Sequence, residues 1–497
     1  MTTTTEEDAP PPTYVGPPQP DPRRWLALSV IAIAQLMIVL DASIVNIALP
    51  HAQADLHIST ADRQWIITAY TLSFGGLLLL GGRIADFTGR RRAFVGGLLA
   101  FAAASALGGA APNAELLFAA RALQGVFAAV LAPASLSLLA VTFTDSRERA
   151  RAFGVYGGIS GGGAAIGLIV GGVLTEFTSW RWCLLVNVPI ALLAAGAAVL
   201  VVRESRASGN TRYDIPGALT VTAGLVLLVY GFTRAAEDGW SANVTLGLLA
   251  AAVALLVAFV VIETRSGAPL LPLRVPLERN RGASYLSSLL VGAGLFAMFL
   301  FLTYYFQASL GYSALRAGFA FLPFSVGIIV SAGITGQLLP RTGPKILMVT
   351  GSLMATGGML LLTGIGLDTG YVSHVLPSEV LMSLGMGLVF VPLTSTALAG
   401  VDAHDAGVAS ALINTTQQVG GSLGTALLNT IFATAVSSYA ADHVPGPDTQ
   451  AEALISGYTT AFVWSAVILF AAFLVILFLL RAGRDELPAG GLPVHAG

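Results

Sequence analysis

Long apolar stretches separated by short polar loops run through most of this chain. Each stretch reaches the roughly 20 residues that a helix needs to cross ~30 Å of hydrocarbon. Apolar residues fill the stretches without strict alternation, which favours spanning helices over a membrane barrel. We therefore predict fourteen spanning helices, over residues 25–49, 63–83, 93–112, 115–141, 150–175, 182–202, 214–234, 241–262, 283–306, 315–339, 345–366, 372–399, 406–436 and 457–480.

Composition supports the same class of protein. Charged residues make up 10% of the chain and hydrophobic residues 55%, with a mean hydropathy of +0.78. Soluble domains carry about 25% charged residues. The chain is therefore predicted to be an all-α integral membrane protein with the lipid bilayer around it. The net charge of −2 implies no general attraction to nucleic acid.

Residue types that hold metals or nucleotides are scarce in the apolar stretches. The single cysteine, Cys183, excludes an internal disulfide and a thiolate metal cluster. The six histidines all fall in loops or tails, and no P-loop pattern is present. We expect no metal, no cofactor and no ATP-driven step.

Two polar stretches divide the chain into blocks. Arg203–Asp214 closes a block of six predicted helices, and Glu263–Arg281 opens another block of six, with two helices between them. A weak repeat supports this plan, because Gly82–Gly89 and Gly336–Gly343 each follow the second helix of a block. Paired halves are typical of secondary transporters. The predicted divisions are a disordered tail at 1–22, a six-helix bundle at 23–205, two additional helices at 206–270, a second six-helix bundle at 271–482 and a tail at 483–497.

The positions of the basic residues predict the orientation. With the N-terminus inside, most of the 25 lysines and arginines fall in cytoplasmic loops, as the positive-inside rule requires. An even number of helices then places both termini in the cytoplasm. The long loop 437–452 would face outside and, being rich in Pro and Gly, would be flexible. Alanine-rich helices and a single lysine, Lys345, suggest a bacterial protein of the cytoplasmic membrane, which we expect to be a monomer.

Asp41 and Arg121 are the two charges well inside the predicted spans. A charge at this depth costs at least roughly 3 kcal/mol and usually marks function. A carboxyl group can load and release a proton, and arginine stays charged at any working pH and can tune a neighbouring carboxylate. We predict that the pair forms the proton-coupling region. The alternatives are a structural ion pair or hydrogen bond for Asp41 and a structural role, through backbone carbonyls, for Arg121.

The loop after the second helix reads GRIADFTGRRR (82–92). An ordinary basic inner loop would explain its arginines but not the glycine–aspartate–glycine spacing. The loop resembles the G-x-L-A-D-R/K-x-G-R/K-R/K loop of the major facilitator superfamily, from which Ile84 and Phe87 depart. The resemblance implies that this loop latches the cytoplasmic gate, a role carried to Gly82, Asp86, Gly89 and Arg90.

Three further motifs resemble the fourteen-helix drug:proton antiporters (EmrB/QacA type) of that superfamily. Leu40–Pro50 is similar to L-D-x-T-x-V-N-x-A-L-P, and RALQG (121–125) is similar to R-x-x-Q-G. The antiport motif G-x-x-x-G-P-x-x-G-G is matched at Gly163, Gly167, Gly171 and Gly172, with Leu168 in place of proline. Small residues at this spacing also pack membrane helices together, so packing alone remains an alternative for the glycines.

The entry to the sixth helix, WRWCLLVNVP (180–189), is also similar to the family pattern W-R-W-x-F-x-I-N-x-P, and Asp214–Gly217 matches the start of the additional helix pair. We predict a substrate cavity lined by Asp41, Asn46, Trp65, Tyr70 and Gln124. Packing is the alternative for Asn46, and a position at the membrane interface is the alternative for the aromatic residues.

The resemblance implies a proton-coupled secondary transporter that exports amphipathic drugs, antibiotics or related small molecules by alternating access. Its partners would be the small-molecule cargo and protons. An importer or exporter of one specific metabolite remains an alternative. A membrane-embedded transferase is less favoured, because the outer acids Asp55, Asp62, Glu115 and Glu176 are scattered over several loops. We therefore expect a transporter and not an enzyme.

Overall fold

The computed structural model describes residues 22–60, 62–143, 146–206, 214–267, 269–401, 406–444, 446 and 448–482. Within these ranges the regular structure is entirely helical. The predicted tails at 1–22, apart from Pro22, and at 483–497 lie outside the described residues.

The first helices are α1 (Arg24–Asp55), α2 (Trp65–Thr88), α3 (Arg90–Gly109), α4 (Ala114–Thr142), α5 (Ser146–Phe177), α6 (Trp182–Leu185), α7 (Asn187–Val201), α8 (Ile215–Asp238) and α9 (Asn243–Arg265). The later ones are α10 (Arg274–Leu277), α11 (Arg279–Tyr304), η1 (Tyr305–Ser309), α12 (Ala314–Ala320), α13 (Leu322–Thr342), α14 (Pro344–Leu361), η2 (Leu362–Gly364), η3 (Tyr371–Val375), α15 (Leu376–Leu398), α16 (Ala406–Asp442) and α17 (Thr449–Leu479).

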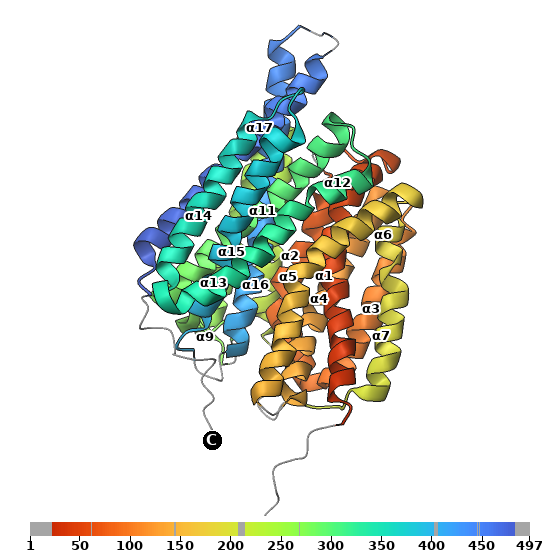
Figure 1. Ribbon diagram of the computed structural model, residues 1–497, viewed down its shortest axis with the longest axis vertical. Coiled ribbons are helices and arrows are strands. Elements are labelled where there is room, and N and C mark those ends of the chain that lie inside the picture. The colour runs from red at the N-terminus through yellow and green to blue at the C-terminus, as the bar shows by residue number, and fades with distance from the viewer. Residues whose placement is uncertain are drawn as a thin grey trace, which may run out of the picture.

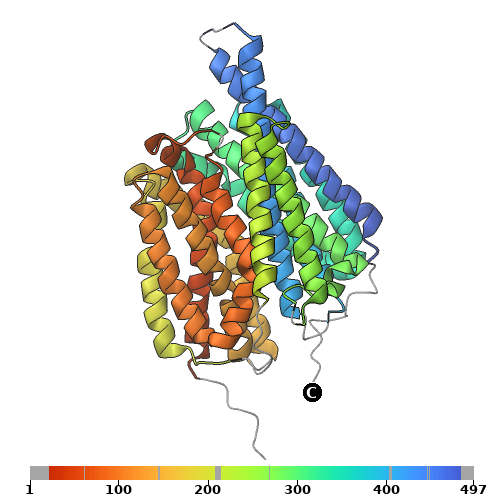
Figure 2. The same cartoon turned by 180° about the vertical axis from the view of Figure 1, so that it is seen from behind.

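Two sets of helices stand side by side (Figure 1). In the first set α2 packs on α4, α1 on α5, and α3 on both α4 and α7. In the second set α11 packs on α16 and α17, and α15 packs on α13 and α14. The helices α8 and α9 pack on each other along the back of the molecule, and α8 also contacts α2 and α16 (Figure 2).

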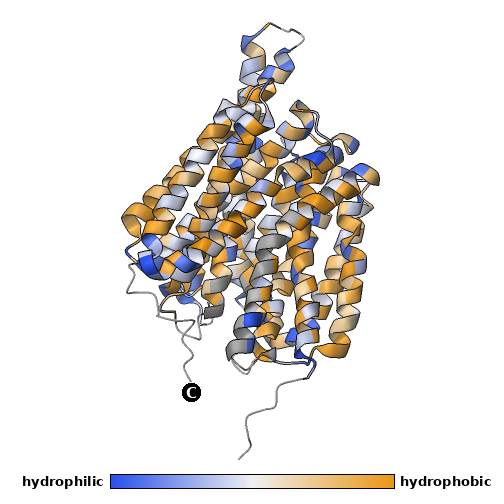
Figure 3. Ribbon diagram, viewed as in Figure 1, coloured by the Kyte–Doolittle hydropathy of each residue, from blue (hydrophilic) through white to orange (hydrophobic). Residues whose placement is uncertain are grey.

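Twelve helical segments of the described chain are long and apolar enough to cross a membrane. Apolar residues dominate these helices along their length (Figure 3). Leu193 and Leu200 of α7 are 75% and 73% exposed, which suits contact with lipid rather than water. Within α2 and α5, the described residues include two shorter apolar segments, Trp65–Leu78 and Ile166–Phe177. The membrane class is therefore supported, with twelve candidate spans among the described residues where the sequence predicts fourteen.

Helix α1 begins and α17 ends at the same end of the molecule, which we call the terminal end (Figure 1). The opposite end, the far end, carries a protruding hairpin of α16 and α17 (Figure 1). Because α16 continues to Asp442 and α17 starts at Thr449, the prediction of a loop over 437–452 was wrong at both edges. Polar residues extend these helices beyond their apolar segments, so a polar composition alone did not mark a loop.

Hydrogen bonds join the two sets of helices from near the middle to the far end. Thr71 and Ser422 share a 2.6 Å hydroxyl contact between α2 and α16. Nearer the far end, Arg63 Nε donates to Asn429 Oδ1 at 3.1 Å. The Leu315 amide donates to Glu176 at 3.0 Å, joining α12 to α5. Among the described residues, the hydrogen bonds between the sets thus hold the far end closed.

Candidate functional site

Asp41 lies in the middle of α1 and has no exposed surface. Its two carboxylate oxygens accept three hydrogen bonds from two other helices. Arg121 Nη1 donates to Oδ2 at 2.7 Å, while Gln124 Nε2 and Asn187 Nδ2 donate to Oδ1 at 2.9 and 2.7 Å. A buried carboxylate needs this degree of pairing, because removing it from water without partners is very costly.

Arg121 is anchored on several sides. Its Nη1 also donates to Gln124 Oε1 at 2.9 Å, and its Nε donates to the Ile66 carbonyl at 2.9 Å. The guanidinium carbon lies 4.5 Å from the centre of the Tyr70 ring, within the range of a cation–π contact. Gln124 Nε2 further donates to Ser105 Oγ at 2.8 Å. The network therefore connects α1, α2, α3, α4 and α7.

The local sequence of α4 explains this geometry. Arg121 and Gln124 are three residues apart and share one face of the helix. Gly125 follows, and a Cβ atom there would lie 2.3 Å from the Tyr70 carbonyl oxygen. Only glycine therefore lets α4 approach α2 closely enough for Arg121 to reach both Ile66 and Asp41. The R-x-x-Q-G pattern thus combines two polar groups with the close contact that positions them.

The predicted cavity residues are only partly brought together. Tyr70 and Gln124 contact Arg121, as described above. Asn46 instead donates to carbonyls of its own helix, Ala42 at 3.2 Å and Ser43 at 3.4 Å. The Trp65 ring lies 6.4 Å from the ring of Tyr230 on α8. Asn46 and Trp65 therefore have no described contact with the Asp41 carboxylate.

Two residues of the site, Asn187 and Ser105, are not predicted by the spans and motifs of the sequence. Asn187 lies in the predicted WRWCLLVNVP motif, but its amide was assigned no role. Ser105 lies among small apolar residues of α3, where nothing in the sequence marks it. Both side chains are fully buried in the structure.

The 82–92 loop ends at the start of α3. Gly89 has φ +110°, a conformation that favours glycine, and precedes the first residue of α3. The Glu204 carboxylate accepts hydrogen bonds from the main-chain amides of Arg91 at 3.1 Å and Arg92 at 3.3 Å. It therefore caps the N-terminus of α3 although it is distant in sequence. The Arg90 amide donates to the Ser205 carbonyl at 2.9 Å. Glu204 was a further residue that the motif did not predict.

Gly82, a predicted latch residue, contributes less to this geometry. A Cβ atom on Gly82 would make only an ordinary 3.5 Å contact with Pro133, whereas one on Gly81 would lie 2.0 Å from the Ala129 carbonyl oxygen. Gly81, not Gly82, therefore marks the close approach of α2 to α4. The side chain of Asp86 lies outside the described part of the structure.

The glycines of α5 face two different neighbours. Cβ atoms on Gly163, Gly167 and Gly171 would meet Val39, Ser43 and Ile44 of α1 at 3.1, 1.9 and 2.9 Å. A Cβ atom on Gly172 would instead lie 2.6 Å from Leu315 Cα, on α12 of the second set. The motif therefore packs α5 on α1 and also brings the two sets together at the far end.

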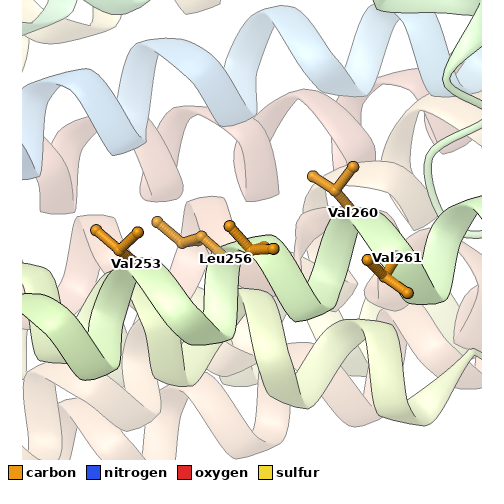
Figure 4. Close-up of a pocket in the computed structure, with 5 residues that line it drawn as sticks. Val253, Leu256, Val260 and Val261 are labelled. Carbon is orange, nitrogen blue, oxygen red and sulfur yellow. The ribbon is translucent and has the colours of Figure 1, made fainter.

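A shallow hollow lies on α9 (Figure 4). Its lining consists only of apolar side chains: Val253, Leu256, Val257, Val260 and Val261. It offers no group that could move a proton. Within the described residues, no group of three potential metal ligands is found.

Comparisons with known proteins agree with this fold. The family model of the Major Facilitator Superfamily matches residues 31–425, so the chain belongs to that superfamily. It is 52% identical over 471 residues to the puromycin resistance protein pur8 of Streptomyces alboniger, covering 94% of this chain and 93% of that protein. It is 40% identical to the cephamycin export protein CmcT of Amycolatopsis lactamdurans, covering 90% of each.

The fold is also similar to a solved transporter structure. A bacterial homologue of the human lysosomal transporter Spinster matches with a TM-score of 0.68 at 13% identity, covering 95% of this chain and 100% of that one. At this identity the match concerns the fold alone. The chain is a transporter of the major facilitator type, and neither comparison points to an enzyme.

Proposed function

We propose that this protein is a proton-coupled exporter of amphipathic drugs or antibiotics that works by alternating access. The observation that carries the proposal is the buried pair of Asp41 and Arg121, which links a protonatable group to the helices that must move. Membrane charges that serve transport are typically paired and face a bundle interior.

The contacts of Asp41 suggest how proton binding drives a change of shape. When Asp41 is ionised, its carboxylate holds α4 through Arg121 and Gln124, and α7 through Asn187. A proton on the carboxyl removes the charge that Arg121 neutralises. The guanidinium of Arg121 keeps its contacts with Gln124 Oε1, the Ile66 carbonyl and the Tyr70 ring. The α1–α4 contact therefore weakens on protonation while Arg121 stays held, which favours movement of α1 relative to α4.

Full burial of Asp41 means that its proton exchanges only after such a movement. In the proposed cycle a proton from outside neutralises Asp41 when the far end is open, and cargo leaves on that side. The proton then leaves to the cytoplasm after the far end has closed again. The same conformational cycle thus carries the proton inward and the cargo outward, and it needs no nucleotide.

The proposed class of cargo is inferred from the names of similar proteins. They include the puromycin resistance protein, the cephamycin export protein and a lincomycin resistance protein of Streptomyces lincolnensis, which is 36% identical over 406 residues. These compounds are chemically diverse, so an amphipathic antibiotic is the proposed class of cargo. A major-facilitator importer or exporter of a specific metabolite is the second candidate, because the Asp41 network itself contains no feature selective for one compound.

The number of spans, the domain boundaries and the membrane location are parts of the same proposal. We take α2 and α5 to span the membrane as well, since they are 24 and 32 residues long and pack against spanning helices. That gives fourteen spans, two six-helix bundles at 23–205 and 271–482 and an additional pair at 206–270. The protein would be a monomer of the bacterial cytoplasmic membrane with both termini inside.

Roles for the motifs follow from this arrangement. With the terminal end inside, Gly82, Asp86, Gly89 and Arg90 would form the latch of the cytoplasmic gate, and Glu204 would hold the start of α3 to the segment that follows α7. The α5 motif would serve antiport by allowing α5 to slide on α1 and to meet α12 at the far end.

The test is puromycin transport in inverted membrane vesicles. Wild-type protein should accumulate puromycin when the vesicle interior is acidified, and Asp41→Asn should abolish that accumulation. The isosteric variant keeps the size and shape of the side chain and removes the titratable group. Gradient-driven transport by Asp41→Asn at the wild-type rate would overturn the proposal. Export of a metabolite, with no response to any antibiotic in a susceptible host, would favour the second candidate.

A further inference from the structure

A second acidic residue is buried in the other set of helices. Glu379 lies in the first turn of α15 and has no exposed surface. It has no ion-pair partner among the described residues, in contrast to Asp41. Its Oε1 atom is buried without a hydrogen-bond partner. An ionised carboxylate in this setting would be far more costly than a neutral carboxylic acid.

The contacts of Tyr371 show where a proton would sit. Tyr371 Oη lies 2.7 Å from the Ala320 carbonyl oxygen and 3.1 Å from Glu379 Oε2. A phenol has one hydrogen, so it can donate a full bond to only one of these two acceptors. If the shorter contact takes the phenol hydrogen, the Oε2–Oη contact is a hydrogen bond only when Oε2 itself carries a proton. The chain of bonds then runs from Glu379 to Tyr371 to Ala320.

The surroundings offer no other compensation for a negative charge. Within the described structure, the basic groups of the packed helices either lie at the terminal end or are engaged elsewhere, and Asp442 of α16 is an exposed acid. Arg316 stands over the Tyr312 ring at 3.8 Å, and the His374 ring is exposed and contacts Ser373. The groups at the terminal end are Arg279 and Arg281 of α11, Arg341 of α13 and Lys345 of α14.

The position of Glu379 connects it to the closed far end. Tyr371 bonds to Ala320 at the end of α12, and α12 also packs on α5 of the first set. Opening the far end must move α12 away from α5, which would disturb the Ala320–Tyr371–Glu379 chain and let water reach the carboxyl. We propose that Glu379 is a second proton site, protonated while the far end is closed and exchanging its proton when the far end opens.

This inference rests on the proposed function, because it assigns a second proton to the opening and closing of the far end in a cycle driven by Asp41. The step transfers only a proton between Glu379 Oε2 and water, so it needs no other reactant. Glu379 takes up its proton from the outside and returns it there, so this proton adds no charge to the exchange of cargo for the Asp41 proton. It instead makes closure of the far end depend on the external pH.

The first experiment measures protonation without any cargo. Infrared spectra of the purified protein in lipid nanodiscs at neutral pH should contain a protonated carboxylic acid band that is lost in Glu379→Gln. The exposed acid Glu452 provides the matched control, and Glu452→Gln should leave the band unchanged. A spectrum that Glu379→Gln does not alter would overturn the proposal, whatever Asp41→Asn does to transport.

The second experiment measures opening of the far end, again without cargo. Distances between spin labels on the exposed residues Thr178 and Val372, in a background with Cys183→Ser, should show that the far end of the wild-type protein opens more as the pH is raised, because loss of the Glu379 proton breaks the Ala320–Tyr371–Glu379 chain. Glu379→Gln should stay closed over the same pH range, and Glu452→Gln should respond as the wild type does. Wild-type distances that do not change with pH, or an unchanged pH response in Glu379→Gln, would overturn the proposal.

Discussion

Asn187 Nδ2 lies 2.7 Å from Asp41 Oδ1 and holds the carboxylate from the first turn of α7. This contact is as short as the one from Arg121 on the opposite oxygen. The carboxylate therefore joins three helices, and its surroundings are set by a neutral amide as well as by a cation. Any movement of α1 that follows protonation must also break or rebuild the bond to α7.

Asn187→Ala should impair export although it removes no charge. Hydrogen bonds to charged groups contribute about 1.5–3 kcal/mol, so losing this one should slow gradient-driven export by roughly tenfold or more. Initial rates of puromycin uptake into inverted vesicles would measure the effect. The control is Asn243→Ala at the exposed start of α9, which should transport normally. Equal rates in the two variants would argue against a role for Asn187.

Removing Arg121 alone should destabilise the protein more than removing both charges. Arg121→Met leaves a buried unpaired carboxylate, a change that typically costs about 3–5 kcal/mol. Asp41→Asn combined with Arg121→Met should recover most of that stability and still fail to transport. Thermal unfolding in detergent would report stability, and vesicle uptake would report function. A double variant as unstable as Arg121→Met would mean that Arg121 acts mainly through Ile66 and Tyr70.

The core of the site could be predicted because charges in hydrocarbon are rare and costly. Asp41 and Arg121 stood out for that reason, and Gln124 lies one helical turn from Arg121. Asn187 and Ser105 could not be found in the same way, since neutral polar residues occur in spanning helices for many reasons. Their role depends on which helices touch, and Asn187 is 146 residues from Asp41 in sequence.

The fold followed from the lengths of the apolar stretches, but the contacts between helices did not. The spacing of glycines in α5 predicted a packing face without indicating which helix it meets. In the structure, Gly163, Gly167 and Gly171 of α5 face α1, and Gly172 faces α12. The 82–92 motif similarly predicted a latch without indicating Glu204, whose carboxylate lies at the start of α3 although it is over a hundred residues away in sequence.

Glu204→Gln should loosen the start of α3. The carboxylate accepts two main-chain amides at a helix N-terminus and lies 3.7 Å from Arg92 Nε, so neutralising it should cost about 0.5–2 kcal/mol locally. Hydrogen exchange of the Arg91 and Arg92 amides should become faster, with little change in the core of α3. The exposed Glu452→Gln serves as the control. Unchanged exchange at both amides would contradict the capping role.

Gly172→Ala should shift the protein away from the conformation in which the far end is closed. A Cβ atom at this position would lie 2.6 Å from Leu315 Cα, and backbone atoms cannot move aside as a flexible side chain can. Overpacking of this kind typically costs about 1–3 kcal/mol, and here the strain is relieved when α5 and α12 separate. We therefore expect the conformation with an open far end to gain population while the packing of α5 on α1 is kept.

Distances between spin labels on the exposed residues Thr178 and Val372, in a background with Cys183→Ser, would measure the shift. Gly196→Ala has no atom within 4 Å of the added Cβ and should leave the distances unchanged. A Gly172→Ala protein with wild-type distances would mean that the α5–α12 contact does not govern closure of the far end.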